Sequence, residues 1–180
     1  MRVIAGEWRG RKLLAPRTDA TRPTADRTRE TLFSMLASRL GSFEGLHVAD
    51  LFAGSGALGI EALSRGAAHC LFGEQDRDAL DALRKNLAAL GAGPRAEIRA
   101  GSVLSLGPAP RACDLLLFDA PYGTGAGSVA LDKLARLGWA GPDSWVSIET
   151  ADREAVDVAG FAIEAERRVG KAKLTLLRRA

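Results

Sequence analysis

The chain has 180 residues, of which 47% are hydrophobic, and its net charge at neutral pH is +3. This composition indicates one domain with a substantial core and excludes a chain that is disordered throughout. No apolar run approaches the roughly 20 residues that cross a bilayer, and the first residues become polar too soon for a secretory signal, so a cytoplasmic protein is expected. Both cysteines, Cys70 and Cys113, fall in apolar stretches that predict core strands, which favours buried thiols over a disulfide or a metal site.

Charge is distributed unevenly along the chain. Residues 1–40 carry a net charge of +5 and residues 165–180 another +5, which leaves −7 for the residues between them. Two basic ends around an acidic centre are typical of a protein that holds a polyanion beside a site for a small molecule. Contact with nucleic acid is therefore expected, although solvated termini alone would give a similar pattern.

Taken in chain order, the hydrophobic pattern predicts an α/β fold. Residues 2–5 and 11–14 flank a turn with two glycines and predict a small hairpin or extended arm. Residues 25–40 predict a helix with its apolar side chains on one face. Strands and helices then alternate, with strands over 46–51, 68–73, 96–98, 114–118 and 145–148 and helices over 57–65, 78–90 and 128–137. Two last strands, 161–164 and 173–177, are joined by a turn around Gly170. We expect a mostly parallel seven-stranded sheet, covered on both faces, with a C-terminal antiparallel hairpin at its edge.

A glycine loop follows the strand at 46–51. Residues 54–59 fit the pattern G-x-G-x-x-G between a strand and a helix, in which glycines allow a sharp turn and a close approach of the backbone to a ligand. Glu74 comes 20 residues after Gly54, at the end of the next strand, where a carboxylate can accept hydrogen bonds from both ribose hydroxyls. NAD-dependent oxidoreductases share this pattern. Asp50, ahead of the glycines, suits a cationic ligand without a pyrophosphate, which favours S-adenosylmethionine.

A second loop, Asp119-Ala120-Pro121-Tyr122, follows the apolar strand at 114–118. An amino group on a purine is a poor nucleophile because its lone pair is delocalised into the ring. Two acceptors on its two N–H groups favour a pyramidal nitrogen, and the Asp119 carboxylate and the Ala120 carbonyl can supply them. Pro121 biases Ala120 towards an extended conformation, and Tyr122 offers a ring on which a base can stack. Direct transfer of a methyl group to such a nitrogen needs no metal.

Both loops resemble known motifs. Residues 50–56 resemble the first motif of class I methyltransferases, which have a Rossmann-like fold. Residues 119–122 resemble the Asp/Asn-Pro-Pro-aromatic motif of enzymes that methylate amino groups of adenine, guanine or glutamine; Ala120 replaces a proline but keeps the carbonyl. Ser102 stands where related enzymes place an acid for the adenine of the cofactor, so its hydroxyl would accept more weakly, or the backbone of residues 101 and 103 makes that contact. The implied cofactor site comprises Asp50, Phe52, Gly54, Ser55, Gly56, Glu74, Ser102 and Asp119.

Nearly the whole chain resembles the RsmD family, the bacterial 16S ribosomal RNA guanine-N2 methyltransferases. The resemblance rests above all on residues 22–33, and also on residues 3–6, 9–13, 50–66 and 170–177. It implies transfer of a methyl group from S-adenosylmethionine to the exocyclic N2 of a guanine in 16S ribosomal RNA, within the assembled small subunit. We expect the enzyme to be a monomer.

The resemblance and the charge pattern together divide the chain into a basic, RNA-contacting arm at residues 1–24, with a hairpin, and a methyltransferase domain at residues 25–180. Trp8 could stack on RNA, but packing within the hairpin is favoured. An alternative role, surface pairs on the helix, fits Arg27, Arg29 and Glu30 equally well. His47 and His69, near strand starts, are interpreted as structural. The expected phosphate contacts are Arg9, Arg11, Lys12, Arg22 and Arg27.

Other functions remain compatible with parts of this pattern. Methylation of adenine N6 in RNA or DNA, or of a protein glutamine, would use the same loop chemistry. The basic ends argue against glutamine, and the length leaves no room for a separate DNA-recognition domain. An NAD-dependent oxidoreductase would leave residues 119–122 without a role, and a non-catalytic RNA-binding protein with this fold would not turn over S-adenosylmethionine.

Overall fold

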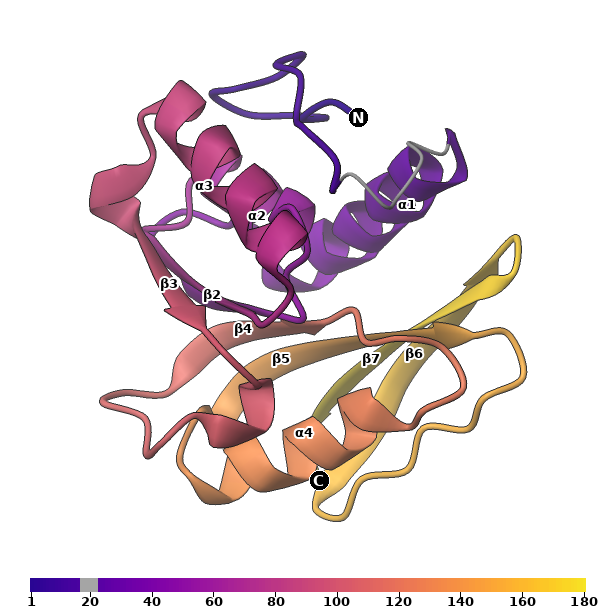
Figure 1. Cartoon of the computed structure of the whole chain (residues 1–180). Helices are drawn as coiled ribbons and strands as arrows, with labels where there is room; N and C mark the ends of the chain where they lie inside the picture. Colours follow the sequence, from indigo (N-terminus) through magenta and orange to yellow (C-terminus); the bar gives the residue numbers. More distant parts are fainter. Residues whose placement is uncertain (17–22) are drawn as a thin grey trace.

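The computed structural model describes residues 1–16 and 23–180 (Figure 1). Within these residues seven strands form one sheet: β1 (His47–Leu51), β2 (His69–Glu74), β3 (Ala96–Ala100), β4 (Cys113–Phe118), β5 (Ala140–Ala151), β6 (Phe161–Val169) and β7 (Ala172–Arg179). Their order across the sheet is β3-β2-β1-β4-β5-β7-β6. Strands β1 to β5 pair in parallel, and β7 runs antiparallel between β5 and β6. The predicted α/β sheet with a C-terminal hairpin at its edge is confirmed.

Helices cover both faces of this sheet. They are α1 (Pro23–Leu40), α2 (Ala57–Ser64), α3 (Arg77–Leu90) and α4 (Ala126–Arg136), with single turns η1 (Gly93–Arg95) and η2 (Val103–Ser105). The first three lie on one face and α4 on the other (Figure 1). Alternate residues of β4 point to the two faces: Leu115 and Leu117 pack with α1–α3, whereas Leu116 and Phe118 pack with α4. Burial on both faces explains why this strand is apolar from Leu115 to Phe118.

Strands β5 and β6 extend furthest beyond the ranges that the sequence predicts. Strand β5 begins at Ala140, although Gly141-Pro142-Asp143 has the composition of a turn, because the strand accommodates these residues at an irregularity where its register with β4 shifts. Strand β6 continues to Val169. It lies at the sheet edge, and residues 166–168 are exposed, so no apolar alternation marks its second half.

Residues 1–14 fold onto α2 and α3. The predicted hairpin is a compact turn with one isolated β-bridge between Arg2 and Lys12. The Glu61 carboxylate of α2 accepts hydrogen bonds from Ile4 N–H at 2.9 Å and Ala5 N–H at 3.0 Å. Further along, Asn86 of α3 accepts from Leu14 N–H at 2.8 Å and donates to the Leu14 carbonyl at 3.0 Å. The arm is therefore held by side chains that are distant from it in the sequence.

Docking of the arm buries two residues for which the sequence left alternative roles open. Trp8 is 7% exposed and packs in the core shared with α1 and α2, as the packing interpretation predicts. Arg29 is only 3% exposed, so its placement in surface ion pairs is wrong. Its guanidinium donates to the Arg2 carbonyl, contacts Asp26 at 3.2 Å and lies 3.7 Å from Glu61. The docked arm covers this part of α1, which the helix sequence alone does not reveal.

The remaining core follows expectation. Cys70 and Cys113 are buried free thiols, and burial raises the pKa of Cys113 to about 11. Among the helices described, none combines the length and the apolar character needed to cross a bilayer.

Candidate active site

The two predicted loops meet at the carboxyl edge of the sheet. Strand order reverses between β1 and β4, which are neighbours in the sheet although β2 and β3 lie between them in the chain. In open α/β sheets such a switch point is where ligands bind. The Asp119 N–H, directly after β4, donates to the Leu51 carbonyl at the end of β1 at 3.3 Å. The glycine loop and the Asp119 loop therefore leave the sheet side by side.

The glycine loop adopts backbone conformations that only particular residues tolerate. Gly56 has φ 88°, and a Cβ added there would lie 2.4 Å from Leu83 Cδ1. Gly59 packs so closely on β2 that an added Cβ would lie 2.4 Å from the Phe72 ring. Phe52 has φ 63°, which is unusual for a residue with a side chain and marks strain of the kind that gathers at ligand sites. Buried Ser55 accepts a hydrogen bond from Asn86 through its carbonyl at 3.0 Å. These contacts fix the turn between β1 and α2.

Asp50 supports the glycine loop from inside. Its side chain is 1% exposed and accepts a hydrogen bond from Gly59 N–H at 2.8 Å. Burial raises the pKa of the Asp50 carboxyl to about 7, although the bond from Gly59 acts in the opposite direction. The carboxyl group thus holds the start of α2 against β1, in addition to any effect of its charge on a bound cation.

Glu74 lies at the end of β2, beside the loop. Its Oε1 accepts from Gly54 N–H at 2.7 Å, and its Oε2 accepts from Gln75 N–H and Asp76 N–H, both at 2.8 Å. The side chain is half-buried, and Gly54, with φ 60°, faces open space, since an added Cβ would meet no atom within 4 Å. This combination of an open glycine backbone and an adjacent carboxylate fits the ribose of a nucleoside cofactor.

Ser102 comes after β3, at the same edge. It is exposed, and its hydroxyl accepts from Leu104 N–H at 3.2 Å, which caps the single turn η2. The hydroxyl is therefore partly engaged within its own turn. The backbone of residues 101 and 103 supplies further polar groups beside the Ser102 hydroxyl.

The loop after β4 presents an acid and an aromatic ring. Asp119, Pro121 and Tyr122 are exposed, whereas Ala120 is buried, so its small side chain anchors the loop in the core. The Thr124 hydroxyl donates to the Pro121 carbonyl at 2.7 Å. Tyr122 is 46% exposed, and its hydroxyl donates to Glu149 Oε2 at 2.6 Å. The ring is thus fixed at one end while part of its surface stays open.

Two acids that sequence reasoning missed complete this loop. Glu149 lies on β5, next to β4, and its carboxyl shares a hydrogen bond with that of Asp119. Burial raises the pKa of Glu149, whereas the hydrogen bonds with Tyr122 and Asp119 act in the opposite direction. Glu154 accepts from the N–H groups of Gly123 and Ala151. A usable signal existed, because Glu149 directly follows the predicted strand 145–148 just as Asp119 directly follows the predicted strand 114–118.

The predicted phosphate contacts lie on the arm and on α1. Arg9, Arg11, Lys12 and Arg27 are exposed. Arg11 donates to the Ala89 carbonyl of α3 at 2.9 Å, which orients it along that helix. Arg22 lies outside the described residues.

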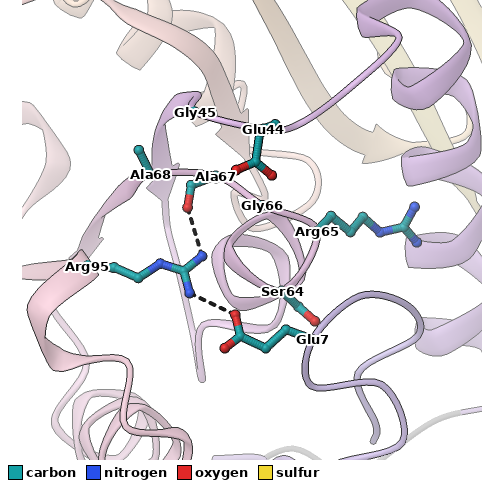
Figure 2. A pocket seen from close by; sticks show the side chains of 9 residues that line it. All are labelled: Glu7, Glu44, Gly45, Ser64, Arg65, Gly66, Ala67, Ala68 and Arg95. Carbon is teal, nitrogen blue, oxygen red and sulfur yellow. Dashed lines mark hydrogen bonds and ion pairs between the residues drawn. The ribbon is translucent and has the colours of Figure 1, made fainter.

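A hollow of about 550 Å³ lies at the opposite, amino-terminal edge of the sheet and contains none of the predicted residues (Figure 2). Arg95 spans it, donating to the Ala67 carbonyl at 2.8 Å and to Glu7 at 3.0 Å, with its guanidinium 5.3 Å from the Trp8 ring. Its charge is therefore engaged by the protein. His47 and His69 also lie at this edge, with ring centroids 5.9 Å apart.

A glycine loop after β1 that meets an acidic loop after β4 across the switch point of a sheet in this order is the arrangement of a class I methyltransferase, an enzyme whose methyl donor is S-adenosylmethionine. The chain belongs to the family described as "Conserved hypothetical protein 95", which matches residues 1–178 and includes the RsmD proteins.

Curated relatives and a solved structure agree with this assignment. The chain is 35% identical over 181 residues to Ribosomal RNA small subunit methyltransferase D of Escherichia coli K12, covering 99% of this chain and 90% of that protein. It is 38% identical over 154 residues to the protein of the same name from Haemophilus influenzae, covering 83% and 78%. The structure of yhhF from Escherichia coli superposes with a TM-score of 0.85 at 35% identity, covering 99% of this chain and 97% of that one.

Proposed function

We propose that the enzyme transfers a methyl group to the exocyclic N2 of a guanine in 16S ribosomal RNA, with the assembled small subunit as its substrate. The observation that carries this proposal is the exposed Asp119 carboxylate beside the partly open Tyr122 ring, at the point where the glycine loop leaves β1. The two relatives described above, both named ribosomal RNA small subunit methyltransferases, support the substrate class.

The chain's own groups activate and hold the amino group. Asp119 accepts a hydrogen bond from one N–H of the amine and the Ala120 carbonyl accepts from the other, which localises the nitrogen lone pair. Tyr122 stacks on the base, a contact worth about 1–3 kcal/mol in other proteins. The bound S-adenosylmethionine supplies an electrophilic methyl group on its sulfonium. The new N–C bond would replace the methyl–sulfur bond, leaving a neutral thioether, and Asp119 takes the proton that the amine loses.

The cofactor is held by the glycine loop and the acids around it. Glu74 accepts hydrogen bonds from the ribose hydroxyls, and the open backbone at Gly54 allows the cofactor to approach. The backbone of Phe52 and Ser55 continues this surface, and the region of Ser102 contacts the adenine. The proposed cofactor site therefore comprises Asp50, Phe52, Gly54, Ser55, Gly56, Glu74, Ser102 and Asp119.

The N-terminal arm, residues 1–24, contacts the RNA backbone in this proposal. The exposed arginines and lysine of the arm and of α1 neutralise phosphates, and the docking of the arm on Glu61 and Asn86 gives them fixed positions. Arg22 belongs to the same proposal. The enzyme acts as a cytoplasmic monomer, and its RNA contacts are Arg9, Arg11, Lys12, Arg22 and Arg27.

The test supplies labelled S-adenosylmethionine with small-subunit ribosomal RNA from cells that lack the modification, either bare or in assembled particles, and identifies the labelled nucleoside. N2-methylguanosine, with faster labelling of particles than of bare RNA, is the expected result. Asp119→Ala serves as the control for contaminating activity. Label in N6-methyladenosine would keep the loop chemistry but overturn the substrate proposed here, and label in neither nucleoside would reject ribosomal RNA as the substrate.

A further inference from the structure

Two carboxyl groups stand together where the target base would enter. Asp119 follows β4, Glu149 lies on the neighbouring β5, and their carboxyl groups share a hydrogen bond. Glu149 also accepts from the Tyr122 hydroxyl at 2.6 Å. In the described part of the chain, no ion pair with Lys or Arg involves Glu149. The amine chemistry described above uses Asp119 and leaves Glu149 without a role.

A pair of neighbouring acids is best satisfied by a ligand with neighbouring donors. Two like charges in a partly buried site disfavour each other's ionisation. Burial raises the pKa of Glu149, whereas its hydrogen bonds with Tyr122 and Asp119 lower it. A ligand that brings two adjacent N–H groups gives each carboxylate its own donor. It thereby replaces the proton that the two groups would otherwise share.

Guanine carries such a pair of donors, and adenine does not. The Watson–Crick edge of guanine presents N1–H beside the N2 amino group, whereas adenine presents an N1 lone pair beside its amino group. Flipped bases are recognised through this edge. We infer that Glu149 selects guanine by accepting its N1–H while Asp119 accepts from the N2 amine, an inference that rests on the proposed function. An adenine at the same place would put its N1 lone pair against a carboxylate.

The test changes the donor pattern of the substrate base. Small subunits are reconstituted with ribosomal RNA that carries either guanine or 2-aminopurine at the methylated position, once nucleoside mapping has located it. 2-Aminopurine keeps the amino group at C2 but has a lone pair at N1. Wild-type enzyme should prefer guanine in kcat/KM by about 100-fold or more, as sites built around a hydrogen bond do. Glu149→Gln can turn its amide N–H towards that lone pair, so the preference should fall at least tenfold.

The inference is tested by how the preference for guanine over 2-aminopurine differs between the wild type and each variant. The preference of one enzyme alone does not test it, because the two bases differ in intrinsic reactivity. Tyr122→Phe removes the hydroxyl that donates to Glu149 and keeps the Glu149 carboxyl. This variant should leave the preference at the wild-type value. Glu154→Gln, a matched change in an acid that accepts from backbone N–H groups at this loop, should do the same. Glu149→Ala, which removes the acceptor altogether, provides a second variant and should also lower the preference.

The outcomes separate the inference from the proposed function. An unchanged preference in both Glu149 variants, with guanine still methylated, would overturn the role of Glu149 alone. An equal shift in Tyr122→Phe would also overturn it, because Glu149 would then act only by fixing the ring. Absence of N2-methylguanosine with wild-type enzyme would instead reject the proposed function.

Discussion

Glu74 Oε1 accepts a hydrogen bond from Gly54 N–H at 2.7 Å, so the acid that ends β2 fastens the glycine loop that follows β1. Its second oxygen accepts two further backbone N–H groups at 2.8 Å. The carboxylate is thereby fixed in place before a cofactor arrives. A ribose that binds Glu74 binds an acceptor whose position is already set, which reduces the entropy lost on binding.

Glu74→Ala should therefore weaken the binding of S-adenosylmethionine. Hydrogen bonds to a charged acceptor contribute about 1.5–3 kcal/mol, which corresponds to a rise in Kd of roughly 10- to 150-fold. Titration calorimetry measures this directly. Glu97→Ala on β3 is the control, because Glu97 forms an exposed ion pair with Arg99, and its Kd should match the wild type. An unchanged Kd in Glu74→Ala would make Glu74 an ordinary surface acid at a strand end.

Asp119→Ala should stop methyl transfer without preventing cofactor binding. The carboxylate is exposed and lies at the mouth of the site, where loss of one preorganised group costs about 100- to 1,000-fold in kcat. Asp119→Asn keeps one oxygen acceptor and should retain more activity than Asp119→Ala. Single-turnover kinetics and calorimetry on the same preparations separate the two effects. Loss of cofactor affinity in Asp119→Ala would make Asp119 primarily a cofactor ligand.

The parts of the fold and of the candidate site that can be predicted are those set by local sequence. The glycine loop follows from the conformations that Gly56 and Gly59 must adopt, and β4 from a continuous apolar run between turns. The position of both loops at one edge is predictable because parallel strands end there. Such features depend on neighbours within a few residues.

What could not be predicted depends on partners distant in the chain. The meeting of Glu149 with Asp119 requires the register of β5 on β4, which shifts at an irregularity. The burial of Arg29 and Trp8 requires the arm to dock on Glu61 and Ser64 of α2. No periodicity in the arm or in α1 encodes that docking, so Arg29 looks like a surface group in the sequence, and the packing of Trp8 is predicted only within the hairpin.

Glu61→Ala should destabilise the whole fold. Glu61 is 1% exposed and holds the arm through Ile4 N–H and Ala5 N–H, and it contacts Arg65 at 2.9 Å and Arg29 at 3.7 Å. Removing one partner of a buried ion pair costs about 3–5 kcal/mol, because the remaining charge stays buried. Urea denaturation should show this loss in the free energy of unfolding. Asp81→Ala, which breaks an exposed pair with Lys85 on α3, should cost less than about 1 kcal/mol. Equal effects in the two variants would contradict the role of Glu61 as the anchor of the arm.

Charge reversal on the arm should change how RNA binding depends on salt. Arg11→Glu combined with Lys12→Glu removes two exposed positive charges and should weaken binding while reducing the slope of log K against log salt by about 1–2. Filter binding over a range of potassium chloride concentrations gives the slope. Arg136→Glu provides a control on α4, on the other face of the sheet, where the side chain is 77% exposed (Figure 1). A slope in the arm variant equal to that of the wild type would remove Arg11 and Lys12 from the RNA interface.

Asp50→Asn should reveal the buried carboxyl through the pH dependence of stability. Burial raises the pKa of Asp50 from 3.8 to about 7 in the folded protein, so the folded state holds a proton that the unfolded state releases between these values. Stability from this group is present at low pH and is lost as pH rises through about 7. The amide that replaces the carboxyl can still accept from Gly59 N–H but does not titrate.

Relative to Asp50→Asn, the wild type should therefore be roughly 2–3 kcal/mol more stable at pH 5 than at pH 8. Urea denaturation of both proteins at the two pH values measures the difference. If the difference in the free energy of unfolding between the wild type and Asp50→Asn did not change with pH, the Gly59 N–H and the glycine loop would compensate the buried charge fully.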